Sequence, residues 1–188
     1  MAIQFGDVTF LLKKLQVATL SAAGTYGTPV TLDVAQTLEF SPKFDTDLLK
    51  GNGFSLEALA VMTDMEGKIS TGTVNRTAAA IMFNWANQTT GTTPNRKVTV
   101  KLQAGLVQPY FGMLGTMIGP QGNDLVIGFY RCLATSLPAF TAEQNKFHLP
   151  EIPIMMIAKD ENAAVMQWQF REYGAASVDI TDFNTWFT

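Results

Sequence analysis

The sequence predicts a mainly β protein: a β-sandwich or barrel-like domain flanked by one short α-helix. Three observations support this prediction. Several short segments alternate apolar and polar residues, which is the two-residue period of a strand that buries one face. Clusters of Gly, Pro, Asn and Asp separate these segments, as turns do between strands. Apolar residues with the spacing of a helix stand out in one segment of the chain.

Five segments carry the strand prediction. Residues 30–34, 98–104 and 166–171 alternate apolar and polar side chains, which predicts strands with one buried face. Residues 125–133 and 152–158 are denser in apolar residues, many of them β-branched or aromatic. Such composition is typical of strands that are covered on both faces.

Turn residues predict two hairpins. The segment 119–124, with the sequence GPQGND, joins 111–118 to 125–133. By the same argument, the turn residues 160–162 join 152–158 to the strand that follows it. A third polar segment, DMEGK over residues 64–68, has two interpretations: a turn between two strands, or a bulge inside one long strand.

One helix is predicted, over about residues 76–86. Asn75 is a suitable N-cap, and the three consecutive alanines that follow favour helix formation. Four apolar residues follow the helical spacing i, i+3, i+4 and i+7: Ala78, Ile81, Met82 and Trp85.

The length of 188 residues predicts one domain, over residues 1–172, with two arms. Residues 40–54 are interpreted as a loop arm that is too apolar for free solvent. Residues 173–188 form a C-terminal arm whose aromatic side chains must dock somewhere; we expect a neighbouring subunit, with the arm's own domain as the alternative. The candidate inter-subunit residues on the two arms are Phe44, Asp45, Asp47, Leu48, Leu49, Trp186 and Phe187.

Composition excludes several functions. With 13 Lys and Arg against 16 Asp and Glu, the chain has no basic excess to hold nucleic acid tightly. One cysteine and one histidine exclude a disulfide framework, a cysteine-built metal site and a multi-histidine zinc site. The longest uncharged segment, 102–123, is too interrupted by Gly and Pro to insert in a membrane. No nucleophile–base constellation stands out, so we expect no catalytic, cofactor-binding or metal-binding residues.

The chain is also short of charge. Charged residues make up 15% of it, against about 25% in a typical soluble domain. The shortage predicts that other subunits cover much of the surface; the alternative is a monomer whose many threonine hydroxyls wet the surface. Three acids fall on the polar side of predicted strands, on either a solvated sheet face or a channel wall: Asp33, Glu39 and Glu57.

The order of these segments resembles that of the major tail (tail tube) proteins of long-tailed bacteriophages. An N-terminal strand pair is followed by the acidic and basic segment FDTDLLKGNG over residues 44–53, then by a long strand region and one short helix. The hairpins come next, and the segments LPAF at 137–140 and LPEIP at 149–153 lead into the final strands. The likeness extends over roughly residues 5–172.

The resemblance implies a fold, partners and a location. It implies a β-sandwich with a flanking helix, related to the type VI secretion tube protein, and hexameric rings that stack into a hollow tube. The implied partners are further copies of the chain, the tape-measure protein, the tail terminator and tail-tip proteins, and viral DNA that passes without specific binding. The implied location is the virion tail, and the cytoplasm of the bacterial host during assembly.

Two further expectations come from the residues themselves. Asp33, Glu39 and Glu57 are candidates for the lumen wall, because a weakly acidic wall does not grip phosphate. The alternative function is a small-ligand or carbohydrate-binding module with an aromatic platform for stacking, for which the candidates are Trp85, Trp168 and Tyr110.

Overall fold

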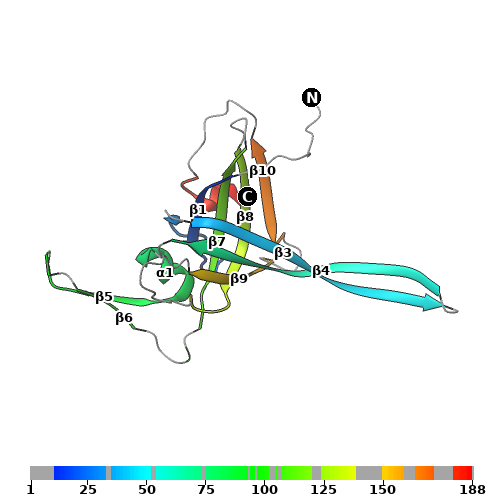
Figure 1. The fold of residues 1–188 in the computed structure, drawn as a ribbon, viewed down its shortest axis with the longest axis horizontal. Coiled ribbons are helices and arrows are strands. Elements are labelled where there is room, and N and C mark those ends of the chain that lie inside the picture. Colours follow the sequence, from blue (N-terminus) through cyan, green and yellow to red (C-terminus); the bar gives the residue numbers. More distant parts are fainter. Residues whose placement is uncertain are drawn as a thin grey trace, which may run out of the picture.

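The computed structural model describes residues 11–32, 35–51, 54–72, 75–92, 94–95, 97–101, 105, 107–119, 124–138, 150–158, 164–171 and 180–187. Strands dominate these residues, so the predicted mainly β fold is confirmed (Figure 1). The elements are, in chain order, β1 (Leu11–Thr19), β2 (Val30–Leu32), β3 (Ala35–Gly51), β4 (Phe54–Thr71), α1 (Arg76–Phe83), β5 (Ala86–Thr90), β6 (Lys97–Lys101), β7 (Tyr110–Ile118), β8 (Asp124–Ala134), β9 (Glu151–Ile157), β10 (Met166–Arg171) and α2 (Phe183–Trp186).

One antiparallel sheet contains most of the strands. Its order is β2-β1-β7-β8-β9-β4-β3, and β10 also pairs with β8. Strands β5 and β6 pair with each other in a separate two-stranded sheet. The predicted hairpin over 111–118 and 125–133 is present, because β7 pairs with β8 along most of its length.

The second predicted hairpin is wrong, because β9 and β10 do not pair with each other. Both lie along the same edge of β8, one after the other: β9 pairs with Arg131–Ala134, and β10 pairs with Asp124–Phe129. The eleven residues of β8 are long enough to hold two partners in succession on one edge. At its other edge β9 pairs with β4, which in turn pairs with β3.

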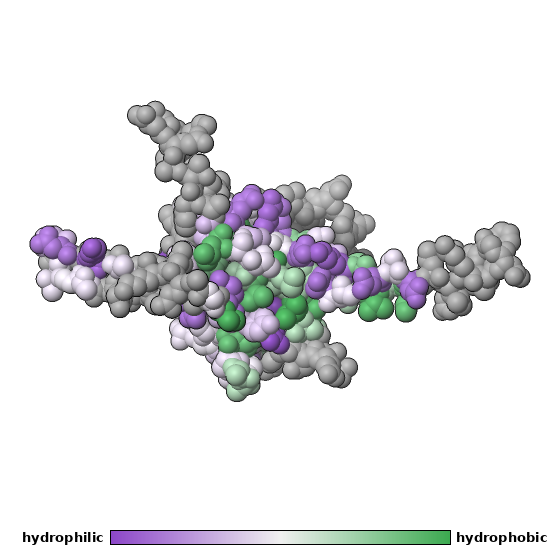
Figure 2. All heavy atoms as spheres, turned by 90° about the horizontal axis from the view of Figure 1, so that it is seen from below, coloured by the Kyte–Doolittle hydropathy of each residue, from purple (hydrophilic) through white to green (hydrophobic). Residues whose placement is uncertain are grey.

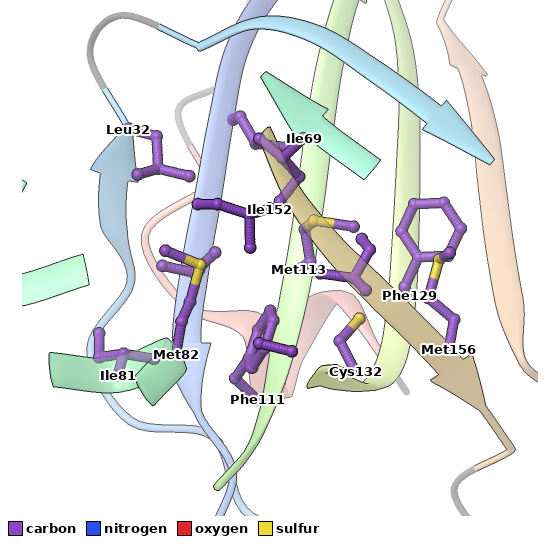
Figure 3. Packing of buried hydrophobic residues seen from close by; sticks show 14 of the residues in the cluster. Leu32, Ile69, Ile81, Met82, Phe111, Met113, Phe129, Cys132, Ile152 and Met156 are labelled. Carbon is purple, nitrogen blue, oxygen red and sulfur yellow. The ribbon is translucent and has the colours of Figure 1, made fainter. Parts of the chain in front are cut away.

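The core lies between two layers of this folded sheet. Strands β1, β7 and β8 contribute side chains from one layer, and β4 and β9 contribute them from the other (Figure 3). Alternation sorts the strands: Leu15 and Val17 of β1 and Ile152, Ile154 and Met156 of β9 are fully or almost fully buried. The partly buried Phe40 of β3 meets Phe129 of β8 edge to face, with ring centroids 5.3 Å apart, and so ties the root of β3 to this core.

Helix α1 closes one side of the core. Its predicted start is confirmed: the Asn75 side chain accepts a hydrogen bond from the backbone N–H of Thr77 at 2.9 Å. The helix ends at Phe83, earlier than predicted, because Asn84 adopts the left-handed conformation with φ of 52°. The N–H of Asn84 caps the carbonyl of Ala80 at 3.0 Å.

The opposite face of β1, β7 and β8 is covered by the end of the chain. Phe183 and Phe187 are buried there against Ala18, Leu114 and Val126. The expectation that Trp186 and Phe187 dock on a neighbouring subunit is therefore wrong, and the alternative holds for residues 180–187. The reason is that this sheet face is itself apolar and has no other cover among the described residues.

Polar contacts fix this C-terminal segment to the domain. The Asn184 side chain accepts a hydrogen bond from the Tyr26 backbone N–H at 2.7 Å and donates one to the Tyr26 carbonyl at 2.9 Å. The buried Gln16 side chain donates to the carbonyl of Ile180 at 3.2 Å. The Tyr26 hydroxyl donates to the Tyr130 carbonyl at 2.7 Å, and burial raises its pKa.

The predicted loop over residues 40–54 is also wrong, because most of it is strand. Residues up to Gly51 belong to β3, which pairs with β4 along its length. Pro42 is tolerated because β3 is the last strand of the sheet, where a missing N–H breaks no ladder on the open side. Of the two interpretations of residues 64–68, one long strand is correct, with a bulge at Thr63 between the partners of Lys43 and Phe44.

The packing of the C-terminal segment predicts the effect of a single methyl group. A Cβ atom at Gly128 would collide with the Trp186 ring, and would lie 2.6 Å from Leu114 Cδ2. We expect Gly128→Ala to lower the free energy of unfolding by about 1–3 kcal/mol, as overpacking does. Denaturant unfolding followed by circular dichroism measures this loss.

The control is the same change in a Trp186→Ala background. Since the ring is then absent, Gly128→Ala costs much less there, and the two effects are not additive. Equal costs in both backgrounds would show that Trp186 does not occupy the space over Gly128.

Candidate functional site

The candidate site is the part of the β3–β4 hairpin that projects from the domain, from Phe44 through Met62. Strand β9 pairs with β4 only over Met65–Ser70, so the hairpin beyond this point leaves the sheet. Figure 1 shows it extending away from the body of the molecule. From Phe44 to Gly51 it spans roughly 25 Å at the usual rise of a strand. We call this part the projecting hairpin.

Large apolar side chains are exposed on the projecting hairpin. The exposed fractions are 55% for Phe44, 62% for Leu59, 51% for Val61 and 40% for Met62. Figure 2 shows apolar atoms on this projection close to the domain. A group of exposed apolar side chains on one element is typical of a surface that contacts another molecule.

The register assigns these residues to the two faces of the projecting hairpin. Phe44 lies opposite Met62, so the pair shares one face. Asp45 lies opposite Val61, and Asp47 lies opposite Leu59, so the other face combines two exposed acids with two exposed apolar residues. Each face therefore has apolar surface, and one of them is also acidic.

The backbone edges of the projecting hairpin are open as well. In the described part of the chain, no strand pairs with the outer edge of β3, and none pairs with the outer edge of β4 before Met65. Unpaired N–H and C=O groups on an exposed strand edge are a template for pairing with another chain. A protein that presents such edges beside apolar side chains needs a partner to cover them.

Ion pairs hold the root of the hairpin. Lys43 of β3 pairs with Glu66 of β4, and this contact raises the pKa of Lys43. Lys68 lies between Glu151 and Glu39, with N–O distances of 3.5 and 3.4 Å, and the two acids raise its pKa. All of these groups are well exposed, so each pair adds little to stability and serves mainly to balance charge.

The structure brings most of the candidate residues together. Phe44, Asp45 and Asp47 lie on the projecting hairpin with exposed side chains. Glu39 lies at its root, exposed and paired with Lys68. Leu48 and Leu49 lie in β3 opposite Ala58 and Glu57, but their side chains, and that of Glu57, are outside the description, as is all of Asp33. Trp186 and Phe187 lie apart, on the domain's own sheet.

Sequence reasoning missed three of the four exposed apolar residues: Leu59, Val61 and Met62. They belong to the segment 56–62, which was expected to be an ordinary strand. The available signal was the near absence of polar residues in LEALAVM, since a strand with one solvated face alternates.

The aromatic candidates for a ligand platform are partly covered. Trp85 stacks on Phe83 at a centroid distance of 5.2 Å and packs against the core. The Arg131 guanidinium lies 3.7 Å from the centre of the Tyr110 ring. The side chain of Trp168 is outside the described residues. Within the described ranges, no group of three or more His, Cys, Asp or Glu is placed to hold a metal ion.

Comparison with known proteins adds no family assignment. No protein-family model matches the chain, and no similar sequence was found among curated proteins. Among the described residues, neither helix has the length and apolar character needed to cross a membrane.

Thiol labelling tests the exposure of the projecting hairpin. The native Cys132 is fully buried, and burial raises its pKa, so we expect it to be inert in the folded protein. A Leu59→Cys variant places a second thiol at a position that is 62% exposed. Unassembled Leu59→Cys protein should bind one equivalent of a disulfide reagent quickly, and the native protein should bind none.

Labelling in denaturant, where both thiols react, is the control for reagent activity. A folded Leu59→Cys variant as unreactive as the native protein would mean that residue 59 is covered within its own chain.

Proposed function

We propose that the protein is a structural subunit of a bacteriophage tail tube, in which copies of the chain form hexameric rings that stack into a hollow conduit. The order of sequence segments suggests this class, and the mainly β domain with one short helix is compatible with it. The observation that carries the proposal is the projecting hairpin, whose apolar side chains and open strand edges call for a second protein surface.

The energetics favour assembly. Fully burying a large apolar side chain is worth roughly 1.5–3 kcal/mol. About half of each of the four exposed side chains remains accessible, so covering all four contributes on the order of 3–6 kcal/mol. Repeated for each copy, this is a substantial driving force for association.

The shape of the chain favours an open assembly. The hairpin projects from one side of the domain, and what it meets is a different surface of the next copy. Contacts between unlike surfaces produce rings when the rotation closes and filaments when it does not. A tube made of stacked rings uses both.

The charge distribution suits passage of DNA. The net charge of −3 and the lack of a basic excess keep the affinity for phosphate low. Of the lumen candidates, Glu39 has its charge balanced by Lys68, so it repels a polyanion only weakly. Asp33 and Glu57 remain the other proposed acids of the wall. In this role the subunit acts as a passive conduit and needs no catalytic group.

A double substitution on the projecting hairpin tests the proposal. In Leu59→Asp/Val61→Asp, two exposed apolar side chains become charged, so any partner that covers them must bury unpaired carboxylates. We expect the variant to keep the thermal midpoint of the unassembled protein and to lose rings and tubes in sedimentation velocity and negative-stain images.

The matched control is Val107→Asp, at an apolar residue that is 82% exposed and lies outside the hairpin. It should assemble like the native protein. Normal tubes from the double variant, or a native protein that stays monomeric at high concentration, would contradict the proposed function.

A further inference from the structure

We propose that the outer face of strands β7, β8 and β9 is the surface that receives the projecting hairpin of a second copy, with Arg131 as the partner of Asp45. The inference rests on the proposed function and adds to it the receiving surface and the charge pair. We call the outer sides of Tyr110, Arg131, Leu133, Met155 and Ile157 the receiving face.

The register places these residues on one face. Tyr110 pairs with Leu133, and Leu133 pairs with Met155, so the three form a row across β7, β8 and β9. Arg131 pairs with Ile157 in a second row beside it. The row between them consists of Phe111, Cys132 and Met156, which are buried in the core on the opposite side of the sheet.

The receiving face is apolar but incompletely covered. Leu133, Met155 and Ile157 are half-buried, and Tyr110 is 37% exposed. On the upper part of β8 the corresponding outer face is covered by Phe187, which packs against Tyr130. The described part of the C-terminal segment therefore covers one half of this sheet face and leaves the receiving face to another chain.

Arg131 supplies the charge. Its guanidinium lies over the Tyr110 ring, which fixes it on the receiving face. Its Nε is buried and has no hydrogen-bond partner among the described residues. A buried donor without a partner is costly, and an incoming carboxylate would satisfy it with a charge-assisted hydrogen bond.

The projecting hairpin has the complementary pattern. One of its faces carries the exposed Asp45 directly opposite the exposed Val61, with Leu59 on the same face. Apolar Val61 and Leu59 match the apolar residues of β8 and β9, and Asp45 matches Arg131. Complementary charge beside apolar contact is what fixes the register of a protein interface.

The hairpin also has the twist that such docking needs. In Figure 1 the ribbons of β3 and β4 cross between the root and the tip. The bulge at Thr63 and the strong twist of a two-stranded ribbon account for this turn. The acidic face of the projecting hairpin consequently points in a different direction from the outer face of its own domain, and is directed at another copy.

Charge reversal tests the pair. We expect Arg131→Glu and Asp45→Arg each to reduce the assembled fraction at least tenfold in sedimentation velocity, because each places like charges together. The double variant Asp45→Arg/Arg131→Glu should assemble like the native protein. An equimolar mixture of the two single variants should also assemble, since each supplies the group that the other one needs.

The control is Lys97→Glu, which makes the same change in charge at an exposed lysine on β6 and should assemble normally. Circular dichroism midpoints show whether each variant is folded. Normal assembly of the single variants, or no rescue by the double variant and the mixture, would overturn the inference while the proposed function stands. A native protein that never assembles would overturn both.

Discussion

Strand β8 is the element on which the rest of the structure depends. It is hydrogen-bonded along both edges, by β7 on one side and by β9 and β10 in succession on the other. Because β9 departs toward β4, the sheet folds over and encloses the main core against one face of β8. The other face is apolar too, and the last residues of the chain cover its upper part. The hairpin that leaves this framework has no such cover, which is why it defines the candidate site.

Local patterns predicted the elements that depend on local chemistry. The alternation of residues 166–171 gave β10 with its observed bounds, Met166–Arg171. The N-cap at Asn75 gave the start of α1, because an Asx side chain that accepts the Thr77 N–H is a short-range interaction. The turn at 119–124 gave the β7–β8 hairpin for the same reason.

Features set by long-range packing were not predictable in this way. Turn residues after β9 indicate that the chain bends, but not that β8 is long enough to accept β9 and β10 on one edge. Pro42 and the glycines near residue 51 suggested a loop, although an edge strand tolerates both. The C-terminal aromatics required burial, and only the apolar outer face of β1, β7 and β8 shows where. The candidate acids and apolar residues of residues 40–54 were identified, and the opposite strand of the site was missed.

The central claim is that this chain is an assembly subunit whose projecting hairpin is covered by further copies of itself. Electron cryomicroscopy of the concentrated native protein tests it most directly. The account predicts hollow filaments of stacked rings, in which density from the β3–β4 hairpin of each copy lies on the domain of another. Particles that contain a single chain at every concentration, with the hairpin exposed to solvent, would contradict it.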